Sequence, residues 1–164
     1  AITQLSGLLR STLQTGKDKL VTIAEEMKIV QDYLHLEKIR YEDRLQLDIY
    51  VDPACVEMKV PPLLIQTLAE NAIKHGISSV AKGGVLKIEV YLADNQLEIT
   101  LNNVGRYKPK KASSGIGIKN SQKRLELLYG EDALLNIQNK NNQVETKVII
   151  PIKVEIQTPE NSAV

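Results

Sequence analysis

The sequence predicts an α/β protein: a two-layer α/β sandwich in which helices cover one face of a mixed sheet, preceded by a helical hairpin. Three observations support this prediction. Apolar residues recur at helical spacing along residues 2–14 and 23–42. They then alternate with polar residues along 44–52, which is the pattern of a half-buried strand. The later strands come mostly as neighbouring hairpins, so the sheet should be mixed or antiparallel, with helices on one face.

A capping box marks the start of the second helix. Thr22 can accept a hydrogen bond from a free backbone amide while Glu25 reaches back to the helix start. The apolar positions that follow form a seam like that of a helical bundle. Two such helices cannot bury their seams alone, so we expect either a partner chain or a third helix to cover them. The partner chain that this predicts is a second copy, in a homodimer through the N-terminal helices. Its contacts should involve Leu5, Leu9, Ile23, Met27, Val30 and Leu34.

Turn and capping residues delimit the later elements. Prolines open, and Gly76 closes, a helix within VPPLLIQTLAENAIKHG. Asp94-Asn95 and Asn141-Asn142 are the turns of two hairpins. The basic segment RYKPKKASSGIG is typical of a mobile loop, and IKNSQKRLELLYG of a short helix. The predicted parts are a helical segment over 1–43, a sheet domain over 44–156 and a flexible tail over 157–164.

Composition argues against several classes of function. A net charge of +1 gives no electrostatic reason to expect nucleic acid, and 4% aromatic residues argue against base stacking. Two histidines and one cysteine are too few for a structural zinc site, and Cys55 is expected to be a small buried residue. No apolar run is long enough to span a bilayer, so we expect no membrane contact by this stretch. The sequence begins without Met inside a helical pattern, and we interpret it as part of a longer protein.

Residues 68–76, LAENAIKHG, carry a polar cluster on a helix whose other side is apolar. Thr67, Asn71 and Lys74 fall on one side of this helix at spacings of four and three. An amide oxygen is a good ligand for Mg²⁺, and lysine is a point charge for phosphate. Taken alone, such a cluster is more often a solvated polar face than a site.

Two further features favour a binding site over a solvated face. The strand LEITLNNVG delivers Asn103 and Gly105 into a turn, and SSGIGIKN places Gly115 and Gly117 before a helix. Glycines permit close approach of a ligand to the backbone, and a helix N-terminus favours phosphate. Each feature is weak alone, whereas the three in this order form a specific combination.

In this combination the sequence resembles the ATP-binding domain of sensor histidine kinases, within the gyrase, chaperone, kinase and mismatch-repair ATPase superfamily. The LytS-type branch, which partners LytTR response regulators, is the most similar. The resemblance is carried by VTIAEEMKIVQDYLHLEKIRYEDRL, VPPLLIQTLAENAIKHG and GIGIKNSQKRLELLYG, and covers about residues 5–152. It implies the Bergerat (GHKL) ATP-binding fold, with ATP and Mg²⁺ as cofactors. It also implies transfer of the γ-phosphoryl group to a histidine, then to a response regulator, in the cytoplasmic portion of a membrane-anchored bacterial sensor.

The resemblance further implies roles for individual residues. Asn71 would hold the Mg²⁺ that bridges the phosphates, Glu70 would polarise a metal-bound water, and Lys74 would reach phosphate; these three form the implied catalytic set. Gly115 and Gly117 would be the hinge of a lid formed by residues 106–114. The implied nucleotide-binding positions are Asn71, Lys74, His75, Asn103, Gly105, Ser114, Gly115, Ile116, Gly117 and Arg124.

Three departures from the family pattern leave a second interpretation open. Asn103 stands where the family reads adenine with an aspartate, and a neutral amide is the weaker acceptor. Tyr107 replaces a glycine at the base of the lid. The family's acceptor histidine has no counterpart, so we expect it on a helix before residue 1 and expect no autophosphorylation by this chain alone. The alternative is a nucleotide-binding regulatory module with weak or lost kinase activity.

Neither histidine of the chain fits the acceptor role. His35 is expected to face solvent on a helix, and His75 lies inside the nucleotide motif. A hydrolytic ATPase is disfavoured as well. Thr67, one turn before Asn71, cannot serve as a general base at neutral pH.

Overall fold

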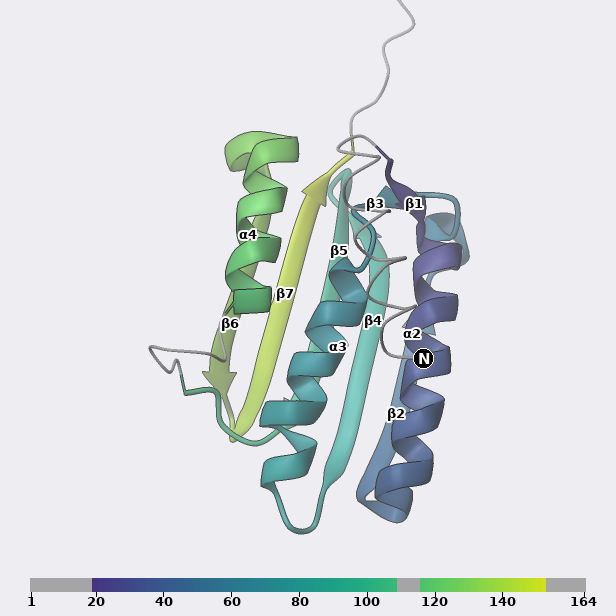
Figure 1. Cartoon of the computed structure of the whole chain (residues 1–164). Helices are drawn as coiled ribbons and strands as arrows, with labels where there is room; N and C mark the ends of the chain where they lie inside the picture. The colour runs from purple at the N-terminus through teal and green to yellow at the C-terminus, as the bar shows by residue number, and fades with distance from the viewer. Residues whose placement is uncertain (1–18, 109–115, 153–164) are drawn as a thin grey trace, which may run out of the picture.

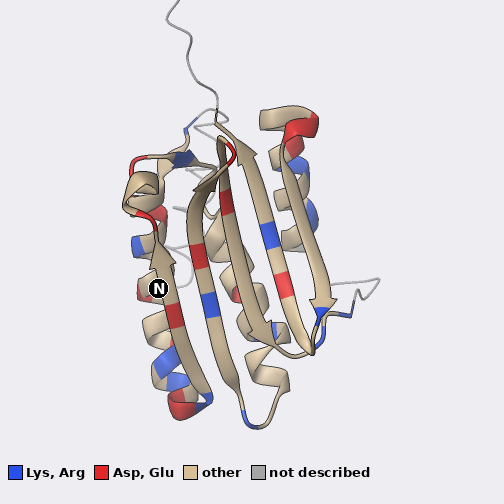
Figure 2. Cartoon of the chain, turned by 180° about the vertical axis from the view of Figure 1, so that it is seen from behind, with Lys and Arg blue, Asp and Glu red and all other residues tan. Residues whose placement is uncertain are grey.

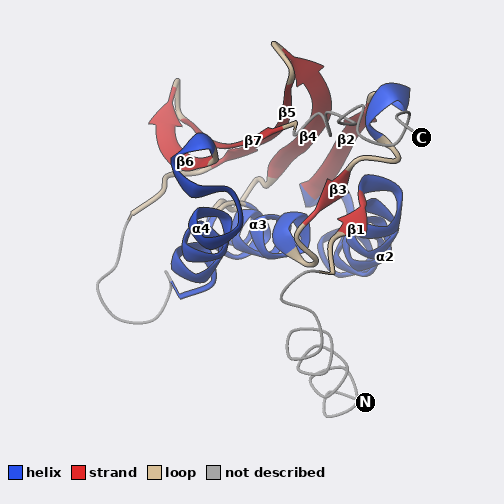
Figure 3. Ribbon diagram, turned by 90° about the horizontal axis from the view of Figure 1, so that it is seen from above, coloured by secondary structure: helices blue, strands red, loops and turns tan. Residues whose placement is uncertain are grey.

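A five-stranded sheet with helices α2, α3 and α4 on one face forms the body of the molecule (Figures 1 and 3). The computed structural model describes residues 19–108 and 116–152. The helices are α2 (Ile23–Tyr41), α3 (Leu64–His75) and α4 (Ile116–Tyr129). The strands are β1 (Val21–Thr22), β2 (Leu45–Val51), β3 (Lys59–Val60), β4 (Gly84–Ala93), β5 (Gln96–Val104), β6 (Leu134–Lys140) and β7 (Gln143–Pro151). Short 3-10 helices lie at Glu42–Arg44, Pro53–Cys55, Ile77–Ser79 and Gly130–Asp132.

The sheet is mixed, as predicted. Its strand order is β2-β4-β5-β7-β6, with β2 parallel to β4 and every other pair antiparallel. A small antiparallel pair of β1 and β3, which the sequence pattern does not predict, lies apart from this sheet. Side chains alternate along the strands, so that Val144, Thr146 and Val148 of β7 are buried beneath the helices. Charged residues occur along the strands, which Figure 2 shows from the side opposite the helices.

Both predicted hairpin turns have the geometry that two-residue turns favour. Asp94 and Asn95 have φ of 52° and 60°, and Asn141 and Asn142 have φ of 53° and 61°. Positive φ at both central residues matches the right-handed twist of the flanking strands, and Asn and Asp tolerate this region best among residues with a Cβ. These turns therefore set the register between β4 and β5 and between β6 and β7.

Helix α2 begins at the predicted capping box. The backbone N–H of Glu25 donates to Thr22 Oγ1 over 3.1 Å, and the Glu25 carboxylate accepts from the backbone N–H of Thr22 over 3.4 Å. The apolar seam of this helix is buried within the chain, because α2 packs on α3 and β2. Ile23, Val30 and Leu34 are fully buried and Met27 is 4% exposed.

The expectation that these four residues contact a second copy is therefore wrong. Their seam is already covered by the chain's own α3 and sheet, which leaves nothing for a partner to bury. From residue 23 onward, the helical segment predicted over 1–43 shares one core with the sheet domain and does not pack separately. The other two expected dimer contacts, Leu5 and Leu9, lie outside the described residues.

Glu26 lies in the same seam and joins α2 to the start of α3. It is fully buried, and its carboxylate accepts from the backbone N–H groups of Leu63 (2.9 Å), Ile65 (2.8 Å) and Gln66 (3.2 Å). Helix α3 has no side-chain cap of its own, because its N-cap position is Leu63, at φ 67°. Burial raises the pKa of Glu26 above its ordinary value, although the three amide donors act in the opposite direction. Glu26 thus caps α3 from another helix and fixes where that helix begins.

Within residues 19–108 and 116–152, no helix is both long enough and apolar enough to cross a membrane.

Candidate functional site

The carboxyl end of α3 lies directly against the end of β5, and glycines make this contact possible. A Cβ at Gly76 would come within 2.1 Å of Asn103 Nδ2, 2.5 Å of the Ala72 oxygen and 2.8 Å of the Val104 oxygen. Gly105 has φ +114°, and a Cβ there would lie 3.1 Å from Gly76 Cα. Two motifs that are far apart in the sequence, LAENAIKHG and NNVG, are thereby brought into backbone contact.

These glycines have a structural function that the sequence analysis did not assign. Gly76 was predicted only as a helix end and Gly105 as a place where a ligand approaches the backbone. In the structure both permit α3 and β5 to approach each other, and Gly105 also needs the left-handed region that glycine enters without strain.

Asn103 is 3% exposed and points into this junction. Its Nδ2 donates to the carbonyl oxygen of Val104 over 2.9 Å. The donor half of the amide is therefore used within the turn, and the carbonyl oxygen remains as the half that could accept from an amino group. An aspartate at this position would have no donor for Val104, which gives a physical reason for the amide found here.

The polar side of α3 runs from the cavity described below towards this junction. Thr67 and Asn71 are half-buried and Lys74 is exposed. Glu70 is exposed and accepts from Gln66 Nε2 over 3.0 Å, so its carboxylate lies along the helix, one turn back. His75, half-buried, is the last residue of the helix, next to Gly76. The resemblance implies four site residues on this helix. Glu70 and Lys74 are exposed, whereas Asn71 and His75 are half-buried.

The start of α4 packs against the first half of α3. A Cβ at Gly117 would lie 3.1 Å from Thr67 Cγ2, so α4 can approach α3 this closely only with a very small residue at that position. Ile116 is the first residue of α4. The predicted site residues Ser114 and Gly115 lie outside the described residues, as does most of the predicted lid.

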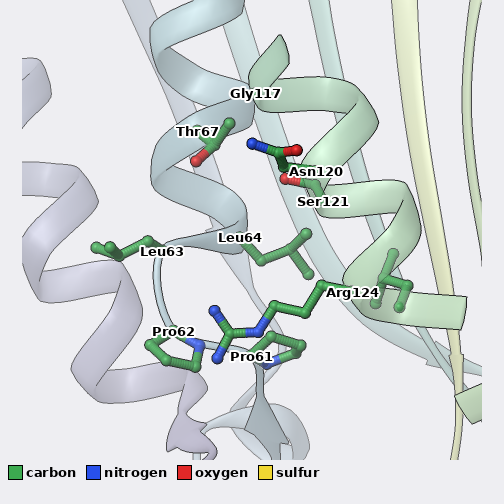
Figure 4. Close-up of a pocket in the computed structure, with 10 residues that line it drawn as sticks. Pro61, Pro62, Leu63, Leu64, Thr67, Gly117, Asn120, Ser121 and Arg124 are labelled. Atoms are coloured by element: carbon green, nitrogen blue, oxygen red, sulfur yellow. The ribbon is translucent and has the colours of Figure 1, made fainter. Parts of the chain in front are cut away.

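A cavity of about 210 Å³ lies between the beginning of α3 and residues 117–125 of α4 (Figure 4). Its walls include Gly117 and Arg124, two of the predicted positions. Its other residues were not predicted: Pro61, Pro62, Leu63, Leu64, Thr67, Asn120, Ser121 and Leu125. One face of α4 carries polar residues at helical spacing after Gly117: Asn120, Ser121 and Arg124. This spacing is present in the sequence, but Asn120 and Ser121 belong to no recognised motif.

The predicted site residues therefore fall into two groups. Gly117 and Arg124 line the cavity at the amino end of α3. The residues along the helix and at its junction with β5 do not line it: Glu70, Asn71, Lys74, His75, Asn103 and Gly105. Asn71 stands between the two regions, one helical turn beyond Thr67.

The base of the predicted lid is attached to β6 by a reciprocal pair of hydrogen bonds. The backbone N–H of Tyr107 donates to Asn139 Oδ1 over 2.8 Å, and Asn139 Nδ2 donates to the Tyr107 carbonyl over 3.0 Å. Tyr107 is the position where a glycine was expected from the resemblance. A side chain on β6 thus holds the backbone at this position, through an N–H and a carbonyl that any residue except proline would supply.

The described residues suit a magnesium ion that takes most of its ligands from the bound nucleotide and from water. Among the described residues no group of three or more His, Cys, Asp or Glu side chains could hold a metal ion. A Mg²⁺ ion beside Asn71 would take one amide oxygen from the protein and complete its shell with phosphate oxygens and water, which is how this ion is usually held at nucleotide sites.

Comparison with known proteins gives consistent relatives. A family model described as histidine kinase matches residues 1–45. Sensor protein LytS of Oceanobacillus iheyensis is 29% identical over 167 residues, which are 93% of this chain and 28% of that protein. LytS of Staphylococcus epidermidis is 30% identical over 163 residues, 92% of this chain and 28% of that protein. Sensor histidine kinase BtsS of Escherichia coli is 33% identical over 129 residues, 78% of this chain and 23% of that protein. The chain thus spans about 28% of the length of the first two relatives.

Solved structures of low sequence identity share the fold. The catalytic domain of histidine kinase ThkA superposes with a TM-score of 0.64 at 15% identity, covering 81% of this chain and 96% of that one. Histidine kinase AdeS of Acinetobacter baumannii superposes with a TM-score of 0.63 at 12% identity, covering 93% of this chain and 81% of that one. The likeness to these domains confirms the predicted two-layer sandwich of the GHKL type.

Proposed function

Because this chain belongs to the LytS-type sensor histidine kinases, we propose that it is the ATP-binding catalytic portion of such a kinase. It binds Mg-ATP and transfers the γ-phosphoryl group to a histidine. One observation carries the proposal: Gly76 and Gly105 bring the carboxyl end of α3 against Asn103 on β5. Asn71, Lys74 and His75 lie on the last turns of the same helix. Phosphoryl transfer depends on positioning and charge neutralisation more than on covalent chemistry by the protein, and these residue types supply both.

Each side chain has a role that follows from its place along α3. Asn71, in the middle of the helix, offers an amide oxygen to the ion, and the exposed Lys74 offers a cation to the phosphates. Glu70 polarises a metal-bound water; one oxygen of its carboxylate accepts from Gln66 Nε2, and the second oxygen can accept from the water without breaking that bond. Bound Mg²⁺ supplies charge neutralisation at the phosphates.

The two ends of the nucleotide meet different parts of the chain. His75 and Gly105 flank the adenine, and the Asn103 oxygen accepts from its amino group. Ile116 and Gly117, at the start of α4, are the proposed backbone contacts of the phosphates. Ser114 and Gly115, which lie outside the described residues, belong to the same proposal. Backbone amides at a helix N-terminus favour such negative charge.

The acceptor histidine is neither of the two in this chain. His35 is exposed on α2, as expected, and His75 is placed beside the nucleotide. The proposed acceptor lies on a helix outside residues 1–164, so this chain alone does not autophosphorylate. Dimerisation through the N-terminal part remains part of the proposal, with contacts outside the four buried positions of α2.

The proposed partner after the histidine is a LytTR-type response regulator. The structural relative ThkA has been solved in complex with the response regulator protein TrrA, which supports a response regulator as the class of partner. The LytTR type follows from the resemblance to the LytS-type branch alone. The proposal places this chain in the cytoplasmic portion of a membrane-anchored bacterial sensor. Neither nucleic acid nor lipid is a proposed partner of this stretch.

Calorimetry with Mg²⁺ and a non-hydrolysable ATP analogue tests the nucleotide site. We expect saturable binding by the unchanged chain and a loss of at least about tenfold in affinity for Asn71→Ala, since a metal ligand is removed. Asn102→Ala is the matched control, because Asn102 is also a half-buried asparagine but lies on β5, away from α3. No binding at millimolar nucleotide would contradict the proposal.

The alternative is a nucleotide-binding regulatory module with weak or lost kinase activity. The neutral amide of Asn103, with its donor engaged by Val104, is the observation that favours it. Mixing the chain with labelled ATP and a peptide carrying the acceptor helix of a LytS relative separates the two functions. Label on the peptide supports the kinase, whereas nucleotide binding without transfer supports the module.

A further inference from the structure

The chain that leaves β5 is held at its start by close packing and two residues later by a single side chain. We call residues 105–107 the exit segment. At its start, a Cβ on Gly105 would lie 3.1 Å from Gly76 Cα, so this end rests on the carboxyl end of α3. At its far end, the Asn139 side chain binds both the N–H and the carbonyl of Tyr107. The exit segment therefore connects α3 to β6.

A cavity of about 320 Å³ separates the exit segment from the β6–β7 hairpin. Two exposed cations line it, Arg106 on the exit segment and Lys140 on β6, and no acidic residue does. Because like charges repel, these two side chains do not draw the segment and the hairpin together. The other residues that line the cavity are Gly105, Asn139, Asn141, Asn142 and Gln143.

Asn139 is therefore the link that keeps the exit segment beside the hairpin. Because β7 lies between β5 and β6 in the sheet, the chain passes the end of β7 on its way to β6 (Figure 1). Among residues 19–108 and 116–152, no other hydrogen bond ties the exit segment to β6 or β7. Gly105 has φ +114°, and a glycine allows the backbone to pivot through regions closed to other residues.

Under the proposed function, the exit segment begins at the adenine end of the nucleotide site. His75 and Gly105 flank the adenine there, and their placement depends on the packing of Gly105 against Gly76. A chain in which Tyr107 leaves Asn139 can pivot about Gly105 and lose that packing. Apparent affinity falls with the fraction of molecules in the binding-competent arrangement. Asn139 raises this fraction before the nucleotide arrives.

We propose that Asn139 is a positioning residue of the nucleotide site, which holds Tyr107 and thereby keeps Gly105 against Gly76. The inference rests on the proposed function and deepens it, because it makes β6 a third element that shapes the site beside α3 and β5. Asn139 itself touches no part of the nucleotide. Its contribution is therefore the same for every adenine nucleotide, whatever the number of phosphates.

The test compares ADP with the non-hydrolysable ATP analogue, both with Mg²⁺, by calorimetry on the full 164-residue chain. Asn139→Ala should weaken both ligands equally, by about fivefold, because two neutral hydrogen bonds that preorganise the site are lost. Asn136→Ala is the matched control: Asn136 is also an exposed asparagine on β6, makes no hydrogen bond among the described residues, and should change neither affinity. Tyr107→Gly retains the N–H and the carbonyl that Asn139 binds, so it should weaken binding less than Asn139→Ala.

Hydrogen exchange of the Tyr107 amide gives a second measurement on the unchanged chain. Coupling between two sites is reciprocal, so saturating ADP should slow this exchange by at least about threefold. Without nucleotide, the same amide should exchange faster in Asn139→Ala than in the unchanged chain.

Three results would overturn the positioning role while leaving the nucleotide site in place. They are an unchanged affinity in Asn139→Ala, unequal losses for ADP and the ATP analogue, and a Tyr107 amide whose exchange does not respond to ADP. Failure of the unchanged chain to bind either nucleotide would instead overturn the proposed function.

Discussion

At its amino end α3 is held by a carboxylate from another helix, whereas at its carboxyl end it is held by the close approach of two backbones. Glu26 accepts three amide hydrogen bonds at the first end, and Gly76 admits the turn of β5 at the second. Each device fixes the helix without using the side chains of its exposed polar side. Asn71 and Lys74 are therefore left available for a ligand.

The two devices differ in what a substitution does to them. A carboxylate can be shortened or neutralised in steps, because it acts through hydrogen bonds to separate amides. The glycine contact cannot be weakened in steps, because even the single methyl group of alanine would overlap the neighbouring backbone. The amino end should therefore respond to substitution in graded steps and the carboxyl end in a single step.

The largest effect is expected at the amino end. Glu26→Ala leaves three backbone N–H groups buried without their acceptor, and each such group costs about 1–3 kcal/mol. We expect the free energy of unfolding to fall by about 4 kcal/mol, measured by urea denaturation. Glu25→Ala is the neighbouring control: it removes an exposed capping side chain and should cost about 1 kcal/mol. Equal losses for the two variants would show that Glu26 does not hold α3.

A slightly smaller effect is expected at the carboxyl end. Gly76→Ala inserts a Cβ within 2.1 Å of Asn103 Nδ2 and 2.8 Å of the Val104 oxygen, so β5 must move away, and within 2.5 Å of the Ala72 oxygen, so the end of α3 must also shift. We expect a loss of about 3 kcal/mol, or a fall in Tm of about 6–12 °C in a thermal melt. Gly130→Ala has nothing within 4 Å of its Cβ, although its φ is +67°, and should cost only about 1 kcal/mol. If Gly76→Ala proves as mild as Gly130→Ala, the junction is looser than the distances indicate.

Asn103→Asp should separate the two functions of the amide at this junction. The carboxylate loses the donor to the Val104 oxygen, so we expect a loss of about 1–2 kcal/mol in the absence of nucleotide. It is also the stronger acceptor for an amino group, so the ATP analogue should raise the Tm of the variant by more than that of the unchanged chain. Asn102→Asp, one residue earlier on the strand, should show neither change. A variant that is more stable without nucleotide would contradict the assigned hydrogen bond.

The smallest effect is a pH dependence at the amino end. Burial raises the pKa of Glu26 above its ordinary value of 4.5, so the folded chain holds this proton more tightly than the unfolded chain. The resulting stabilisation is fully present below the ordinary value and is lost as pH rises through the folded pKa. The stability of the unchanged chain relative to Glu26→Gln should therefore fall as pH increases from about 4, by at most about 1.4 kcal/mol per pH unit. A relative stability that rises with pH would mean that the amide donors outweigh burial.

Prediction from the sequence succeeded where the pattern is local. The capping box at Thr22 and the paired turn residues act through neighbouring backbone, so their geometry can be read from a few residues. Prediction failed where the partner is distant. The seam of α2 leaves a partner chain and a third helix open as its cover, and the contacts predicted with a second copy are wrong, because periodicity reveals that a face is apolar but not what covers it.

The candidate site shows the same limit. Its motif residues on α3 could be predicted, but Glu26 and Asn139 could not, because each acts on backbone more than 30 residues away. The sequence does contain one indication of the role of Glu26: this residue falls on the apolar seam, and the start of α3 lacks a capping residue. Asn120 and Ser121 were visible only as a helical face and acquire meaning once α4 is seen beside α3.

The reciprocal pair between Asn139 and Tyr107 has a consequence for exchanging parts among relatives. The Asn139 side chain joins the β6–β7 hairpin to the first residues after Gly105. The two segments should therefore be exchanged together. A chimaera that imports a foreign segment after Gly105 will need the matching residue at position 139, even though the two lie in separate stretches of the gene. Segment swaps designed by motif boundaries alone would separate the two segments.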